Sequence, residues 1–176
     1  MMIEPLQKLE AWHDFYVMTG SGAAALTGLL FVIVSLGPHV VAKSVDTGVR
    51  AFISPIAVHF TSALALSALM LAPEIPRLPL GTAVAVGGAG LIVYTLWTRA
   101  NTQWRHNKLP VLDWIWFIGL PMLTFLLIAG SGIAIAANAA IGLYALATAT
   151  VLLIVVGIIL NVLGGGFYYH VGSTTP

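Results

Sequence analysis

The chain has 176 residues, of which 59% are hydrophobic and only 7% are charged, whereas a soluble domain has about 25% charged residues. The formal net charge of +1 provides no basic surface for nucleic-acid binding. The absence of cysteine excludes disulfides, thiolate catalysis and cysteine metal sites. Nearly every charge falls between apolar stretches or at their ends, which predicts an integral membrane protein without a separate soluble domain.

Residues 1–11 carry apolar side chains at helical spacing, with Glu4, Lys8 and Glu10 between them. This pattern predicts an amphipathic segment that lies along the membrane interface, or alternatively a frayed tail. The segment lacks the basic stretch and small-residue cleavage site of a secretory signal, so we expect residues 12–36 to be retained as the first membrane span. This span has no charge after Asp14 and is longer than the about 20 residues that a bilayer requires.

The first span has two expected faces. Small side chains let helix backbones approach closely in lipid, and those of this span recur at spacings of three, four and seven: Gly20, Ala24, Thr27, Gly28 and Ser35. We expect these residues to form the packing face. The residues expected to face lipid are Leu26, Leu29, Leu30 and Ile33. Aromatic side chains anchor at membrane borders, and those expected at the outer border include Trp12, Phe15 and Tyr16.

The same span carries a resemblance. Its residues 12–16, WHDFY, and 22–32, GAAALTGLLFV, together with Ser35, resemble the opening of a family of small, uncharacterised, multi-span bacterial integral membrane proteins. The resemblance implies a bacterial inner-membrane protein without an assigned activity. It brings no catalytic residues to this chain.

The second predicted span, residues 49–71, is the most polar. Its Ser54, His59, Thr61 and Ser62 fall on two sides of a helix, and such a helix is poorly suited to face lipid, so we expect it at the centre of the bundle. His59 lies about ten residues into the span, near the bilayer midplane. We expect it either to relay a proton or bind haem, a metal or a substrate, or to be a neutral side chain that bonds to a serine or backbone carbonyl of the next helix.

Three further spans are predicted over residues 80–97, 113–137 and 142–163. Glycine and alanine crowd positions 81–90, so we expect the first of these spans to contact a neighbour closely. Asp113 is placed to cap the fourth span and Pro121 to kink it. The short link at 138–141 predicts an antiparallel hairpin of the last two spans, and we expect the glycines at 164–166 to end the fifth span.

Basic residues set the predicted orientation. Of the seven Lys and Arg residues, the five on one side of the predicted bundle are Lys43, Arg50, Arg99, Arg105 and Lys108. The two on the other side are Lys8 and Arg77. The positive-inside bias therefore predicts the N-terminus outside and the C-terminus in the cytoplasm. The five residues are also candidates for binding anionic lipid headgroups, the alternative being a role in topology alone.

Glu10, His13 and Asp14 give a Glu-x-x-His pattern at the outer edge. Glu10 and His13 share a helix face, as in carboxylate–histidine metal sites, but such sites need a second helix of the same kind. We therefore expect polar anchoring rather than a metal site. The sequence also lacks a phosphate-binding loop, a serine nucleophile motif and a His-Glu-x-x-His pattern, so we expect neither an enzyme nor a cofactor.

These patterns predict an all-α membrane protein with a bundle of five transmembrane helices over residues 12–176. Small residues line more helix surface than five helices use among themselves, so we expect a non-catalytic protein that forms homo-oligomers or serves as an accessory or scaffold subunit of a larger membrane assembly. Its partners are then the lipid bilayer and other membrane subunits. One alternative is a small pore or transporter with a pathway lined by His59, Ser54, Thr61, Ser62 and Thr27. Another is a haem- or quinone-binding electron carrier.

Overall fold

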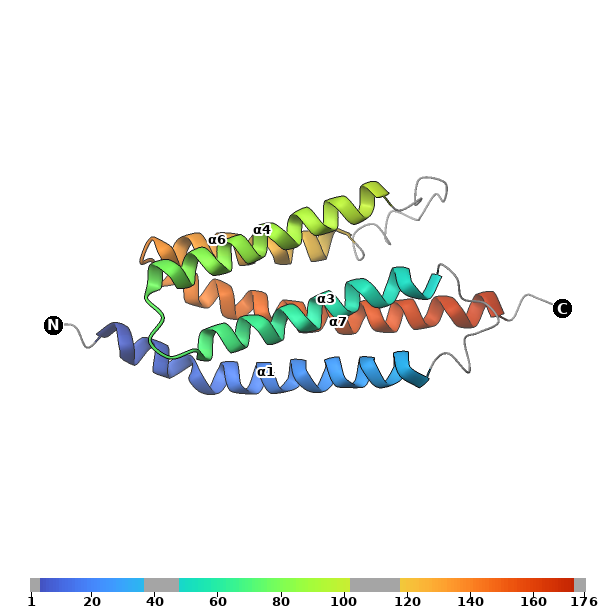
Figure 1. The fold of residues 1–176 in the computed structure, drawn as a ribbon, viewed down its shortest axis with the longest axis horizontal. Helices are drawn as coiled ribbons and strands as arrows, with labels where there is room; N and C mark the ends of the chain where they lie inside the picture. Colours follow the sequence, from blue (N-terminus) through green and yellow to red (C-terminus); the bar gives the residue numbers. More distant parts are fainter. Residues whose placement is uncertain (1–3, 37–47, 102–117, 173–176) are drawn as a thin grey trace. The chain divides into compact units, whose positions relative to one another are not determined.

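The computed structural model describes residues 4–36, 48–101 and 118–172, and side chains over most of 12–162 within these ranges. In these ranges the chain forms five helices and no strand, which confirms the all-helical class. Figure 1 shows the five helices, which are α1 (Glu4–Leu36), α3 (Gly48–Leu71), α4 (Arg77–Asn101), α6 (Leu120–Ala136) and α7 (Ile141–Gly172).

Three of the described helices are long and apolar enough to cross a membrane. The stretches are Trp12–Ile33 in α1, Arg77–Thr98 in α4 and Ile141–Val162 in α7, each of 22 residues. At about 1.5 Å per residue, each is roughly 33 Å long, which matches a hydrocarbon core of about 30 Å. The apolar stretches Pro55–Leu71 and Leu120–Ala136 are shorter.

Several helix ends differ from the predicted ones. Helix α1 runs from Glu4 to Leu36, so it begins eight residues before the predicted first span and includes residues 4–11 of the predicted amphipathic segment. Helix α7 continues through the glycines at 164–166 to Gly172, because a helix that is already nucleated propagates at little cost per residue. The prediction that these glycines end the helix was wrong.

The fourth span is described only in part. Helix α6 begins at Leu120, with Pro121 as its second residue. Residues 118–119 directly before it are π-helical, and the predicted kink at Pro121 therefore falls next to a change of helix type. Asp113, the predicted cap, lies outside the described residues.

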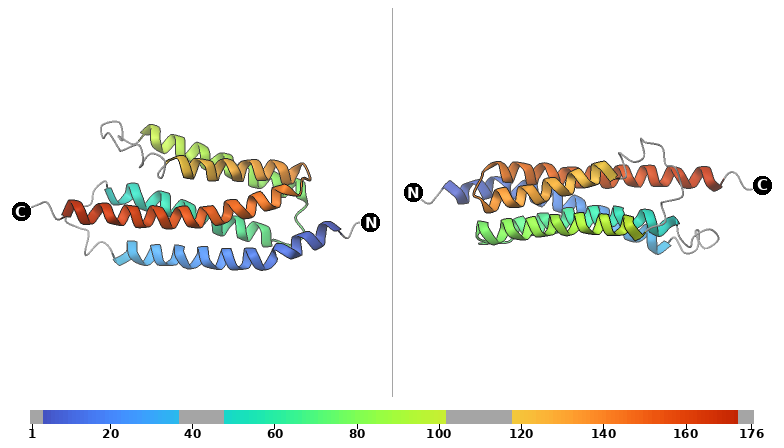
Figure 2. Two further views of the ribbon diagram at one scale, coloured as in Figure 1. Left: turned by 180° about the vertical axis from the view of Figure 1, so that it is seen from behind. Right: turned by 90° about the horizontal axis from the view of Figure 1, so that it is seen from above.

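The helices form two compact units. One contains α1, α3 and the part of α7 from Leu153 onward, and the other contains α4, α6 and the part of α7 up to Leu152. Within the first unit α1 packs along α3, and within the second α4 packs along α6. The views in Figure 2 agree with these two pairings.

In the first unit α3 contacts both of its partners. Phe60 of α3 lies against Gly157 of α7, where an added methyl group would come within 2.5 Å of the Phe60 ring. Ser67 of α3 lies against Gly20 of α1, where an added methyl group would lie 2.9 Å from the Ser67 Cβ. Within this unit α3 therefore has close contacts with both α1 and α7, while its place at the centre of a five-helix bundle stays a prediction.

The packing face of α1 differs from the predicted one. Gly20 is buried as expected and Thr27 is half-buried, but Ala24, Gly28 and Ser35 are exposed. The buried residues are Tyr16, Thr19, Gly20, Ala23 and Leu30. Positions 16, 23 and 30 recur every seven residues and so lie on one helix face. Leu30 was expected to face lipid and Tyr16 to anchor at the border; both instead fill this face.

In the second unit α4 and α6 touch backbone to backbone, as the glycine-rich third span predicted. A methyl group on Gly81 would lie 2.6 Å from the carbonyl oxygen of Gly132, and one on Gly132 would lie 2.7 Å from that of Gly81. At this pair the two backbones are so close that neither position has room for a side chain. Seven residues after Gly81, Gly88 is another point of close contact, where an added methyl group would lie 2.6 Å from the backbone nitrogen of Ala129.

Candidate functional site

His59 is the most deeply placed ionisable residue that the sequence indicated. Its side chain is 2% exposed, and Nδ1 donates a hydrogen bond of 2.7 Å to the backbone carbonyl of Pro55, one turn earlier on α3. In a neutral imidazole only one nitrogen carries the proton, so Nε2 is the nitrogen that can accept a hydrogen bond. This carbonyl belongs to α3, the helix that carries His59.

Two of the other predicted pathway residues form hydrogen bonds within their own helices. Thr61 is exposed and donates its hydroxyl hydrogen to the carbonyl of Ala57 at 2.6 Å. Thr27 donates to the carbonyl of Ala23 on its own helix at 2.8 Å. Ser62 is half-buried, and the side chain of Ser54 lies outside the described residues.

Most threonine hydroxyls of the described helices bond in this local way. The donors that reach the carbonyl four residues earlier include Thr95, Thr124, Thr148 and Thr150. A threonine hydroxyl that donates to a backbone carbonyl of its own helix has its hydrogen-bond donor satisfied within that helix. These hydroxyl protons are therefore already used within the helix and are not offered to a ligand or an ion.

A polar contact between two helices joins Thr19 of α1 to Ser67 of α3, with their hydroxyl oxygens 3.2 Å apart and buried. Thr19 also donates to the Phe15 carbonyl at 2.9 Å. A hydroxyl has a single proton, so Ser67 supplies the proton of the interhelical bond. Sequence reasoning missed Thr19, whose one signal is its place beside Gly20, the residue that brings Ser67 close.

Tyr16 lies on the same face of α1 and is 1% exposed. Its hydroxyl oxygen is buried and has no hydrogen-bond partner within the described part of the chain. Burial of a polar group without a partner costs about 1–3 kcal/mol. Tyr16 therefore stands out as a buried group whose hydroxyl detracts from stability.

Within α1, at the N-terminal end of the predicted first span, His13 Nδ1 lies 3.1 Å from Asp14 Oδ1, and both side chains are exposed. This is a contact between neighbours in sequence, and the side chain of Glu10 lies outside the described residues. Over the described ranges no three His, Asp or Glu side chains are grouped as they would be around a metal ion.

The link between α6 and α7 carries a polar contact that sequence reasoning did not find. Asn138 has a positive φ of 62°, and its N–H donates to the Ile135 carbonyl while that of Ala139 donates to the Ala134 carbonyl. This is the bond pattern of a Schellman motif. The guanidinium of Arg77, at the start of α4, donates to the side-chain oxygen of Asn138. Arg77 therefore joins α4 to the hairpin, whose predicted short link is confirmed.

The predicted headgroup-binding residues lie mostly beyond what the structure describes. Lys43, Arg105 and Lys108 fall outside the described residues. Arg50 and Arg99 belong to α3 and α4, but their side chains are not described.

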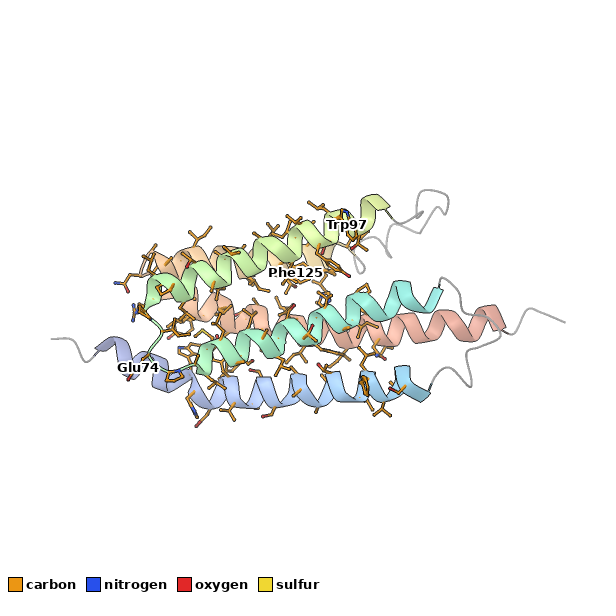
Figure 3. The ribbon with its side chains drawn as sticks, in the orientation of Figure 1. Glu74, Trp97 and Phe125 are labelled. Carbon is orange, nitrogen blue, oxygen red and sulfur yellow. The ribbon has the colours of Figure 1, made fainter. Side chains whose placement is uncertain are left out.

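Glycines on α1 and α4 divide into two groups. Gly20, Gly81 and Gly88 face a neighbouring helix so closely that a methyl group would clash. The others stand open, because no described atom lies within 4 Å of a methyl group placed on them: Gly22, Gly28, Gly87 and Gly90. On α4 the open pair is flanked by Val86 and Val93, which are 71% and 64% exposed, and Trp97 is also exposed toward the end of the helix (Figure 3).

These open positions define two surfaces. We call the one around Gly87 and Gly90 the α4 open face, and the one around Gly22 and Gly28 the α1 open face.

Comparison of the chain with protein-family models, curated proteins and solved structures gives no match. The resemblance of the first span to small bacterial membrane proteins therefore stays a prediction.

Proposed function

We propose that the chain is a non-catalytic integral membrane subunit that works within an assembly, either with copies of itself or with another membrane protein. All five helices cross the bilayer in this proposal, with the N-terminus outside and the C-terminus in the cytoplasm of a bacterial inner membrane. Support for membrane insertion comes from the three apolar stretches of 22 residues. Support for the orientation comes from the five-to-two division of basic residues.

The observation that carries the assembly is the contrast between occupied and open glycines on α4. Gly81 and Gly88 bring the backbone of α6 into contact, whereas Gly87 and Gly90 meet no described atom within 4 Å. In lipid no hydrophobic force drives helices together, and close backbone packing at small residues contributes much of the association. The α4 open face has the same residue type as the occupied face, so it suits a further helix.

The α1 open face extends this reasoning to a second helix. Gly22 and Gly28 are open, and Ser21, Ala24 and Ala25 beside them are exposed. Small residues spaced along one side of a spanning helix suit close helix contact better than they suit lipid tails. Two such faces on one chain favour a subunit that contacts partners at more than one place.

The test compares two substitutions on neighbouring positions of α4. Gly87→Leu places a large side chain on the α4 open face, at a position where an added Cβ meets no described atom within 4 Å, so we expect the free subunit to fold normally. Val86→Leu is the matched control, because Val86 is already a large, exposed side chain beside the face. After purification in mild detergent, we expect native mass measurement to find an assembly for the wild type and for Val86→Leu. For Gly87→Leu we expect it to find the free subunit.

Circular dichroism and thermal unfolding check that both variants keep the native fold. The proposal fails if the wild-type chain is purely monomeric in several mild detergents and brings no other membrane protein with it. If Gly87→Leu and Gly90→Leu both assemble as the wild type does, the α4 open face is not an assembly surface.

The pore or transporter alternative has less support. The predicted pathway combines His59 with several hydroxyl groups. Thr61 is exposed, however, and the hydroxyls of Thr27 and Thr61 both donate hydrogen bonds to carbonyls of their own helices. What still favours it is the burial of the ionisable His59 side chain.

A further inference from the structure

We draw no further inference here: the strongest candidate, the α4 open face around Gly87 and Gly90, belongs to the assembly surface already proposed, and nothing in the described part of the structure shows which partner covers it.

Discussion

Gly87 and Gly88 are adjacent in sequence, yet the structure predicts opposite effects for the same substitution. A methyl group on Gly88 would lie 2.6 Å from the backbone nitrogen of Ala129 and 2.9 Å from its Cα, whereas one on Gly87 would meet no described atom within 4 Å. The perturbation is therefore Gly88→Ala compared with Gly87→Ala. Both add one methyl group to the same helix, so helix propensity changes equally and the difference isolates packing.

The magnitude follows from two effects. Alanine favours the helix over glycine by about 1 kcal/mol, so Gly87→Ala should raise the free energy of unfolding by about that amount. Overpacking costs about 1–3 kcal/mol, and at Gly88 the atoms met first are backbone, which no rotamer change can move. We take the upper end of that range, which leaves Gly88→Ala destabilised by about 2 kcal/mol after the gain in propensity.

The two variants should then differ by about 3 kcal/mol, or roughly a hundredfold in the unfolding equilibrium constant. The assay is reversible unfolding in mixed micelles, followed by circular dichroism as the fraction of denaturing detergent rises. It should be run where the midpoint does not depend on protein concentration, because association would otherwise add to the stability. Gly90→Ala, at the second open position, should behave as Gly87→Ala does. Equal shifts in the same direction at Gly87 and Gly88 would refute the close α4–α6 contact.

Three further substitutions test other parts of the structure by the same unfolding assay. Tyr16→Phe should raise the free energy of unfolding by about 1 kcal/mol, because it removes a buried hydroxyl that has no partner in the described chain; a loss of stability would indicate that the native state satisfies this group. Glu74 has a φ of 58°, a backbone region that costs a non-glycine residue about 1–2 kcal/mol, so Glu74→Gly should stabilise while Glu74→Ala should not, and equal effects would argue against this backbone conformation. Asn138→Ala should cost about 1–2 kcal/mol, since it loses both the Arg77 bond and a residue suited to positive φ; Asn138→Gly should cost less, and an equal loss would assign the whole effect to the side-chain bond.

Helix identity was readable from the sequence because it depends on local features. The stretch predicted over residues 49–71 is α3, Gly48–Leu71, and Pro73 and Pro76 follow its end. The short link after α6 was equally clear, since Asn138 tolerates the positive φ that the turn requires. Apolar length and turn residues are enough for assignments of this kind.

The extent of α1 and α7 was harder to predict, because local propensity is a weak guide once a helix is established. Three consecutive glycines reduce helix stability by about 1 kcal/mol each relative to alanine, which suggested that α7 ends at 164. The helix instead continues to Gly172. Similarly, the predicted first span begins at residue 12, whereas α1 begins at Glu4.

The packing face of α1 could not be predicted from the sequence for a different reason. A small residue permits close approach, but whether it is used depends on what the partner helix presents at that height. Gly20 is used because Ser67 of α3 lies opposite, whereas Gly28 faces no described atom within 4 Å. On the same face of α1 the large side chains of Tyr16 and Leu30 are buried. A stripe of small residues therefore shows where a contact is possible, and the partner decides where it forms.

This distinction bears on the glycines that remain open. Glycine in a helix costs about 1 kcal/mol relative to alanine, and an occupied glycine offsets this cost by admitting a neighbouring backbone, as Gly81 and Gly88 do. Gly22, Gly28, Gly87 and Gly90 gain no such contact within the described chain, so together they weaken its helices by about 4 kcal/mol. That is a large share of the 5–15 kcal/mol by which folded proteins are usually stable. A contact with a second polypeptide is the simplest physical source of an offsetting gain, which is why the open faces favour an assembly over an isolated subunit.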